Sequence, residues 1–426
     1  MKGKQIFLAI VITVALLALV FAMLKREEKV ASANESSIGK ELLKDLPVND
    51  VQKIKIKGPK SGEVIITKGD EGWSVSSLFN YPADFAKVKE FITEIAELKN
   101  IQNIEVGKSN LSRLNLEINE SSDSGTTVEF LGNNDKQIAT LIVGKEHKKK
   151  TTGEEEAYGG MEYPDGRYIL VQGKNDVHVV DKTLNKIENS SKDWLNKDFI
   201  SAIDFKIASL EQEGQTKWTV YREKKEDPMK PDIPVPDEHE IDKDKMSSIA
   251  NCLYTIRFAN IADPNLPPSE TGLDNPSIFR AETFNGKKYE ISIGKQKDNA
   301  RYVKVAVSYS TPKEEVPDEQ AQSSSDDPKA KEEKEKKEKE RAEALKKAEE
   351  EAKSEQEKYG KWIYLIAEAS LKAMLSSEKE LFKKIEKKED NKKEQNVEPP
   401  PPPIPSPEDE NSEEDMPEEI PLPSQD

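Results

Sequence analysis

An uncharged apolar run near the amino terminus constrains this chain more than any other feature. From Ile6 to Leu24 the sequence contains no charged residue, and lysine or arginine flanks the run on both sides. At about 1.5 Å per residue, a helix of this length matches the roughly 30 Å hydrocarbon core of a bilayer. The run therefore predicts one transmembrane helix, with the membrane itself as a partner of residues Ile6 to Leu24.

A cleaved signal peptide is the alternative interpretation of the same run. Its apolar region would be unusually long, and the small-residue pattern Ala31 to Ala33 lies beyond the charged stretch Lys25–Lys29. We therefore expect an uncleaved signal anchor with residues 1–5 as a cytoplasmic stub. The flanking positive charges are nearly balanced, so only the shortness of the stub favours an extracytoplasmic, periplasmic location for the bulk of the chain.

The composition indicates that only part of the chain has enough apolar side chains to form a buried core. Hydrophobic and charged residues each make up 35% of the chain, and the hydrophobic share is below the globular average. Residues 311–358 are almost devoid of apolar side chains, but their lysine–glutamate pairs four residues apart permit a solvated helix. They lack the apolar stripe of a coiled coil. We expect a charged helical or disordered insertion there, resembling a coiled coil in composition only.

The end of the sequence is acidic and rich in proline. Residues 388–426 include the run Pro399–Pro403 and only a few scattered apolar side chains. This composition predicts a disordered acidic Pro-rich tail, which either docks on an aromatic groove of a partner or serves as a spacer.

Alternating apolar residues open the region that can fold. Val51, Ile54 and Ile56 precede a turn rich in glycine, and Val64–Ile66 follow it, which predicts a β-hairpin. A third short strand is expected around Trp73. Apolar residues at helical spacing after Pro82 then predict an amphipathic helix whose buried side chains are Val88, Phe91, Ile92, Ile95 and Leu98. Further strands are expected at Val128–Leu131, Ile138–Val143, Tyr168–Val171 and Val177–Val180, and Asp181 is expected to cap a short helix.

The same arrangement recurs later in the chain. Ile203 to Ile207 predicts another strand, and Trp218 lies in its expected partner. Without gaps and at one constant spacing, Asp84 falls on Asp242, and the apolar face of the first helix falls on Met246, Ile249, Leu253 and Ile256. Segments Ser190–Leu195 and Ser377–Phe382 match at a larger spacing, because the charged insertion lies between the two halves of the second copy.

Internal duplication is the interpretation we favour, the alternative being a chance likeness between two α/β stretches. The predicted fold class is α+β, with two tandem related units after one N-terminal transmembrane helix. Each unit is expected to be a mostly antiparallel sheet with a packed amphipathic helix. A linker at residues 25–48 would precede a first repeat at 49–200 and a second repeat at 201–310 and 359–387.

Residues that carry catalysis or bind metals are scattered. His147, His178 and His239 lie in different expected elements, whereas a metal or catalytic cluster requires convergence. Neither a Gly-x-Ser-x-Gly elbow nor a phosphate-binding glycine loop occurs. Cys252 lies between apolar helical residues, where a structural thiol is expected. We therefore predict no catalytic, cofactor-binding or metal-binding residue, and a protein that is not an enzyme.

Two pairs of residues have competing interpretations. Asp84 and Asp242 are expected to cap their helices, where an acid favours the helix dipole, although paired carboxylates across the repeats are the functional alternative. Trp73 and Trp218 are expected to anchor their sheets, and ligand stacking is the alternative. The formal net charge of −17 argues against a nucleic-acid partner.

Short motifs around the predicted helices resemble a known family. Trp73 is followed by Tyr81-Pro82-Ala83-Asp84, and Gly272-Leu273-Asp274-Asn275-Pro276 precedes a strand ending in Ile-Gly. This combination resembles an uncharacterised bacterial domain-of-unknown-function family of membrane-anchored tandem-repeat proteins, encoded beside gliding-motility-type ABC transporter genes. The first copy departs from the pattern, because Arg113-Leu114-Asn115 stands in place of the Gly-Leu-Asp step. The family has no established catalytic residues to carry over.

Taken together, these features predict a single-pass protein of a bacterial inner membrane. We expect an extracytoplasmic binding or scaffolding protein, and the resemblance implies a membrane-complex partner of the ABC-transporter type. The alternatives are an envelope carbohydrate-active hydrolase that uses paired acids and a purely structural spacer. The hydrolase requires acids from both repeats to converge in one cleft.

Overall fold

The computed structural model describes residues 38–44, 46–119, 121–150, 161–174, 176–312 and 328–385. The chain divides into two compact units, Met1–Lys384 and Ile385–Asp426, and only Ile385 of the second is described. The predicted anchor Ile6–Leu24 and the predicted tail therefore lie outside the described residues. Within the described parts of the chain, no helix combines the length and the apolar character that crossing a membrane requires.

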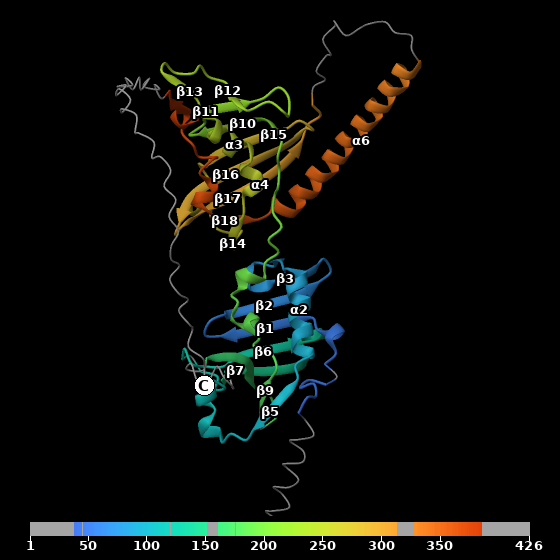
Figure 1. Cartoon of the computed structure of the whole chain (residues 1–426), viewed down its shortest axis with the longest axis vertical. Coiled ribbons are helices and arrows are strands. Elements are labelled where there is room, and N and C mark those ends of the chain that lie inside the picture. The colour runs from blue at the N-terminus through green and yellow to red at the C-terminus, as the bar shows by residue number, and fades with distance from the viewer. Residues whose placement is uncertain are drawn as a thin grey trace, which may run out of the picture. The chain divides into compact units, whose positions relative to one another are not determined.

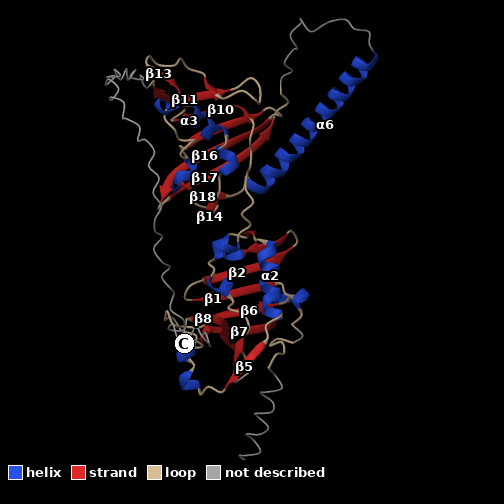
Figure 2. Ribbon diagram, viewed as in Figure 1, coloured by secondary structure: helices blue, strands red, loops and turns tan. Residues whose placement is uncertain are grey.

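The first half of the chain forms a nine-stranded sheet within the described residues, with the order β4-β3-β2-β1-β6-β7-β8-β9-β5. Neighbouring strands are antiparallel throughout (Figures 1 and 2). Its strands are β1 (Lys53–Gly58), β2 (Gly62–Gly69), β3 (Gly72–Val75), β4 (Tyr81–Pro82), β5 (Asn100–Ile104), β6 (Thr126–Leu131), β7 (Gln137–Lys150), β8 (Glu162–Val171) and β9 (Val177–Val180). Its helical elements include the α-helix α2 (Phe85–Ala96) and the 3₁₀ helices η1 (Val48–Asp50), η7 (Asn185–Glu188) and η8 (Ser191–Trp194).

The second half forms an eight-stranded sheet with the order β12-β11-β10-β15-β16-β17-β18-β14 and a separate pair, β13 with β19. The strands are β10 (Phe205–Gln212), β11 (Gln215–Tyr221), β12 (Lys230–Pro231), β13 (His239–Ile241), β14 (Phe258–Ala262), β15 (Ser277–Thr283), β16 (Lys287–Lys297), β17 (Ala300–Tyr309), β18 (Ile363–Ala367) and β19 (Phe382–Lys384). The helices are α3 (Lys243–Ala250), α4 (Cys252–Thr255), α5 (Pro268–Thr271), α6 (Pro328–Tyr359), α7 (Glu368–Leu371) and the 3₁₀ helix η10 (Glu378–Leu381). Antiparallel sheets with few helices are the α+β class that the sequence predicts.

The strand orders of the two sheets correspond. Reading from β2 to β5 in the first sheet gives the same sequence of connections as reading from β11 to β14 in the second. The first hairpin of each sheet also has matching register, with Ile54 opposite Ile66 and Ala208 opposite Val220. The core positions of both hairpins are therefore set by the same pattern of alternating apolar residues.

The two equivalent helices begin with the aspartates that the sequence singles out. The Asp84 carboxylate accepts a hydrogen bond from the Lys87 amide at 3.2 Å, and the Asp242 carboxylate accepts from the amides of Asp244 and Lys245 at 3.0 Å. The backbone amides of both aspartates donate to equivalent carbonyls, those of Trp194 and Leu381. Capping is thus the role that the geometry assigns to both carboxylates. The aligned helix side chains are buried in each case: Val88, Phe91, Ile95 and Leu98, and Met246, Ile249, Leu253 and Ile256.

Three details of the sequence interpretation need correction. Helix α2 begins at Phe85 rather than Pro82, because Pro82 belongs to β4. Asp181 caps no helix, since its carboxylate accepts from the Lys99 amide and η7 is preceded by Leu184 in the left-handed conformation. Trp73 lies in β3 whereas Trp218 lies in β11, so the two tryptophans occupy strands that are not equivalent.

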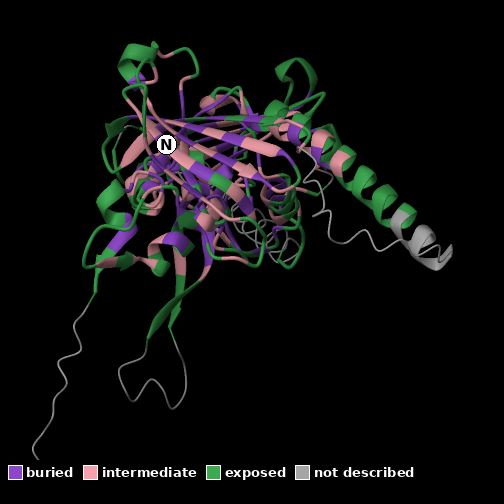
Figure 3. Cartoon of the chain, turned by 90° about the horizontal axis from the view of Figure 1, so that it is seen from above, coloured by how far each residue is buried: buried purple, intermediate pink, exposed green. Residues whose placement is uncertain are grey.

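The charged insertion is helical over residues 328–358, which belong to α6, and not over its other described residues, 311 and 312. Helix α6 is exposed along much of its length, and its last turns pack against β17 and β16 (Figure 3). Ala348 and Ala352 are buried there, and Lys287 Nζ lies 3.1 Å from Glu351 Oε2 and 2.9 Å from Glu355 Oε1. This part of the chain is thus a helix with a short alanine face that makes the contact.

Candidate functional site

A groove on the second sheet offers a cavity of about 890 Å³. We call it the β12 groove, because it opens between β12, the segment that enters β10, and helix α3. Its walls come from Ile203–Asp204, Arg222–Glu223, Asp227–Lys230, Ile241, one side of α3 and Asn251, which follows α3. The apolar side chains that line it are Ile203, Pro228, Met229, Ile241, Met246 and Ala250.

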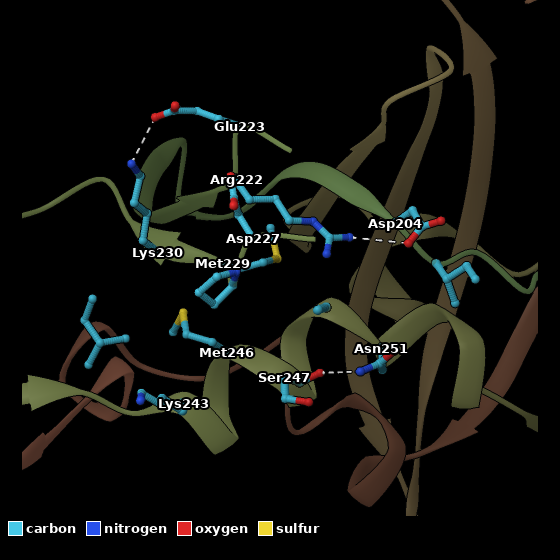
Figure 4. A pocket seen from close by; sticks show the side chains of 14 residues that line it. Asp204, Arg222, Glu223, Asp227, Met229, Lys230, Lys243, Met246, Ser247 and Asn251 are labelled. Atoms are coloured by element: carbon cyan, nitrogen blue, oxygen red, sulfur yellow. Dashed lines mark hydrogen bonds and ion pairs between the residues drawn. The ribbon is translucent and has the colours of Figure 1, made fainter. Parts of the chain in front are cut away.

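Two methionines form the centre of the groove. Met229 and Met246 are 4% and 2% exposed, and Figure 4 shows them on opposite walls of the cavity. Both belong to the hydrophobic core, and their flexible thioether side chains can adapt to apolar groups of different shapes where they border the cavity. The groove therefore can accept a bulky apolar side chain.

The rim of the groove carries both signs of charge. Glu223 lies 3.1 Å from Lys230, and their hydrogen bond raises the pKa of the lysine. Asp204 lies 3.7 Å from Arg222, as the dashed line in Figure 4 shows. The Asp227 carboxylate accepts from the Lys224 amide at 3.1 Å. Each rim acid is thus already engaged with a cation or an amide, so the arrangement favours binding over acid–base chemistry.

The first sheet fills the position that the groove leaves open. In the first hairpin Lys68 pairs with Trp73, and the register of the second hairpin brings Met229 to the place of Trp73. Trp73 packs against the core, and α2 contacts both β3 and η1. On the helix, Ala250 of α3 aligns with Ile92 of α2 at the spacing that aligns Asp242 with Asp84. Smaller side chains at two facing positions therefore accompany the open groove.

The three histidines remain apart in their hydrogen bonding. His147 Nδ1 lies 2.6 Å from Asp165 Oδ1, and His239 Nδ1 lies 2.7 Å from the Asp237 carbonyl. His178 Nδ1 lies 2.7 Å from Asn103 Oδ1, and burial lowers the pKa of His178. Among the described residues, no group of three or more His, Cys, Asp or Glu side chains is placed to hold a metal ion.

The other residues singled out by the sequence serve the fold. Cys252 is 3% exposed in α4, and burial raises the pKa of its thiol. Trp218 is 1% exposed, and its Nε1 donates to the Ser376 carbonyl at 2.7 Å. Trp73 is half-buried against the core. These contacts assign core roles to all three.

Lys197 is a partly buried cation that the sequence did not reveal. Its Nζ donates to the Ala259 carbonyl at 2.9 Å and lies 4.5 Å from the centre of the Phe258 ring. Burial lowers the pKa of Lys197 to about 8. Its neighbours Asn196 and Asp198 are polar, so no pattern in the sequence marks this lysine as buried.

Each sheet also contains an arginine anchor that the sequence did not reveal. Arg167 Nε donates to the Gly144 carbonyl at 2.9 Å, and Nη2 lies 2.7 Å from Glu188 Oε1. In the second sheet, Arg301 reaches the Gly294 carbonyl at 3.3 Å and Glu368 at 2.8 Å. An arginine on β8 and one on β17 thus each bond to a glycine carbonyl of the preceding strand, β7 or β16, and to an acid further along the chain.

Comparison with known proteins gives one match. No curated protein and no solved structure matches the chain. Residues 73–276 match the model of a protein family described as a domain of unknown function (DUF4340). The matched stretch includes all the residues that line the β12 groove. The chain is therefore similar, over the stretch that contains the candidate site, to an uncharacterised domain family.

Proposed function

We propose that this chain is a membrane-tethered, extracytoplasmic binding or scaffolding protein without catalytic activity. The observation that carries the proposal is the β12 groove, which has buried methionines at its floor and rim acids that are already engaged with a cation or an amide. Such a surface combines hydrophobic contact with polar positioning, which is the usual composition of a recognition site. The acids that a hydrolase would use are occupied by lysine, arginine or backbone partners.

We further propose that the two sheets are copies of one duplicated unit. The matching strand orders, the two capping aspartates and the two arginine anchors support this relationship. Duplication gives one copy freedom to diverge while the other retains its packing. In this proposal, the open edge of the second sheet is the divergent, binding-competent copy.

The uncharged run Ile6–Leu24 supports the tether, and the family resemblance supports a partner in an ABC-type transporter complex. Protease added to spheroplasts should digest the folded region if it lies outside the cytoplasm. Protection of the whole chain in intact spheroplasts, with digestion after lysis, would contradict this orientation.

Capture of partners from membranes tests the function. The tagged full chain is crosslinked in cells, solubilised in detergent and purified, and we expect a permease or ATPase of one complex to be recovered. Ala250→Glu places a charge on the groove floor and should reduce recovery at least about fivefold. Ser248→Glu, on the exposed side of the same helix, is the matched control and should leave recovery unchanged.

Two outcomes would oppose the proposal. Recovery of no membrane protein favours the structural spacer. Equal recovery with Ala250→Glu, in a chain whose circular dichroism matches that of the parent, would show that the groove is not the binding site.

A further inference from the structure

The edges of the two sheets differ in one backbone pairing. In the first sheet β4 pairs with β3, and the Ala83 amide donates to the Trp73 carbonyl at 2.8 Å. Ala83 corresponds to Ile241 in the second copy, which lies in β13. The bridge between Ala83 and Leu195 has its counterpart there in the pairing of Ile241 with Phe382 between β13 and β19, but β13 does not pair with β12. Strand β12 is therefore an edge strand in the second sheet, where its counterpart β3 is covered.

The backbone at Met229 is left open by this change. Met229 corresponds to Trp73, and neither its amide nor its carbonyl has a hydrogen-bond partner among the described residues. The Asp232 amide donates to the Thr219 carbonyl, so the backbone groups of Asp232 face β11. Because this direction alternates along an extended chain, the backbone groups of Pro231 and Met229 point away from β11. Pro231 has no N–H to offer, so Met229 is the position that can both donate and accept at this edge.

The side chains around Met229 match this open backbone. Met229 stands in the place of Trp73, and Ala250 stands in the place of Ile92. An incoming segment that pairs with Met229 would alternate its side chains, so one of them would point onto the floor formed with Met246. Lys243 at the rim has no ion-pair partner among the described residues and can receive an acidic side chain.

We propose that the β12 groove binds an extended polypeptide segment of a partner protein, which adds as a strand beside Met229 and inserts one bulky apolar side chain. The segment takes the place that β4 takes in the first sheet. Main-chain hydrogen bonds supply affinity in this mode, and the side-chain pocket supplies specificity. The inference rests on the proposed binding function and names the class of partner.

The chain itself supplies the starting sequence of a probe for this site. A fluorescent peptide with the sequence of residues 77–85 and the change Ala83→Phe, which contains β4 and the acid Asp84, is titrated into the full chain in detergent. Ala83 donates to the Trp73 carbonyl in the first sheet, so the phenylalanine gives the peptide a bulky apolar side chain at the position that would face Met229. We expect saturable binding with a dissociation constant on the order of 10–100 μM, and at least tenfold weaker binding for a peptide of the same composition in scrambled order.

Variants that copy the first sheet should close the groove. Met229→Trp and, separately, Ala250→Ile restore the side chains found at Trp73 and Ile92, and each should weaken peptide binding at least about fivefold. Tyr254→Trp adds a tryptophan at an exposed site on α4 outside the groove and should leave binding unchanged. Two independent filling variants keep the test informative if one of them folds poorly.

The possible outcomes are distinguishable. Absence of peptide binding up to about 1 mM, or binding unaffected by both filling variants, overturns the strand-addition proposal. If the partner capture described above succeeds at the same time, the proposed function stands and only the docking mode fails. Concentration-dependent self-association of the full chain that Met229→Trp abolishes would instead identify a second copy as the occupant and overturn the partner proposal.

Discussion

The first and second sheets have corresponding strand orders but different edges. In the first, β4 covers β3 and Trp73 packs against the core, whereas in the second β12 is an edge strand above two methionines. The shared features lie inside: capped helices, arginine anchors and glycines at close approaches. The comparison teaches that the shared buried residues maintain the strand order of both sheets. The outermost strand can gain or lose a pairing partner without a change in that order.

Glycine at the close approaches should be the most sensitive shared feature. A Cβ at Gly144 would collide with the Leu114 carbonyl, and one at Gly294 would collide with the Thr271 carbonyl. Gly144→Ala and Gly294→Ala should each lower the free energy of unfolding by about 3 kcal/mol in urea denaturation. Gly107→Ala has open space around it and should change stability by less than about 0.5 kcal/mol. A harmless Gly294→Ala beside a damaging Gly144→Ala would break the correspondence.

The arginine anchors should differ in strength because they differ in burial. The Arg167 side chain is 7% exposed and that of Arg301 is 28% exposed. Arg167→Ala should therefore cost about 3 kcal/mol, because it leaves the Gly144 and Thr183 carbonyls without this donor and Glu188 with Lys60 alone. Arg301→Ala should cost about 1 kcal/mol. Urea denaturation of the two variants measures the difference. Equal costs would mean that burial does not set the strength of these anchors.

The capping aspartates of α2 and α3 should make smaller and equal contributions to the stability of the two halves. Asp84→Ala and Asp242→Ala each remove an acceptor for a helix amide, so each should cost about 1 kcal/mol. Asp84→Asn and Asp242→Asn keep the acceptor and should recover most of that loss. Thermal denaturation of the four variants checks the pattern. A cost confined to one aspartate would contradict equivalent roles.

Lys197 should add a pH dependence that its polar neighbours do not. Burial lowers its pKa to about 8, so the folded chain releases this proton at lower pH than the unfolded chain. Between the folded pKa and the unfolded value near 10.5, the unfolded state binds more protons, and stability therefore rises with pH in that window. Melting temperatures of the parent relative to Lys197→Met should increase from pH 7.5 to 10. A flat difference would show that the ammonium is solvated.

Strong periodicity explains what the sequence predicted well. Ile54 and Ile56 alternate, and Val88, Phe91 and Ile95 recur at helical spacing, so hairpin and helix follow from local pattern. Strands β5 and β14 were missed. Asn100–Ile104 is largely polar, and its pairing with β9 is set by tertiary structure. Phe258–Ala262 is mostly apolar but short, and it lacks the alternation of polar and apolar residues that marks a strand. Lys197 and Arg167 carry no pattern that distinguishes a buried cation from a solvated one.

The groove could not be predicted for a different reason. In the first sheet β4 pairs with β3, whereas in the second sheet no described strand pairs with the outer edge of β12. The spacing of apolar residues in a sequence reports which side chains are buried, but it does not report which backbone groups lack a partner. The sequence did mark the cause of the groove, because the Pro-rich stretch after Tyr221 lengthens the connection between β12 and β13. Only the register shows that Met229 takes the place of Trp73.

The long helix α6 shows where this chain can accept inserted residues. In the first sheet a short turn joins Val171 to Val177, whereas the corresponding connection in the second runs from Tyr309 to Ile363 and contains α6. Loop-closure entropy rises only with the logarithm of length, so a roughly tenfold longer connection costs about 2 kcal/mol. Glu351, Glu355 and Gln356 bind the last turns of α6 to β16 and β17. Whole helical turns added or deleted before Glu351 would therefore change the length of α6 and leave the fold of the sheet intact.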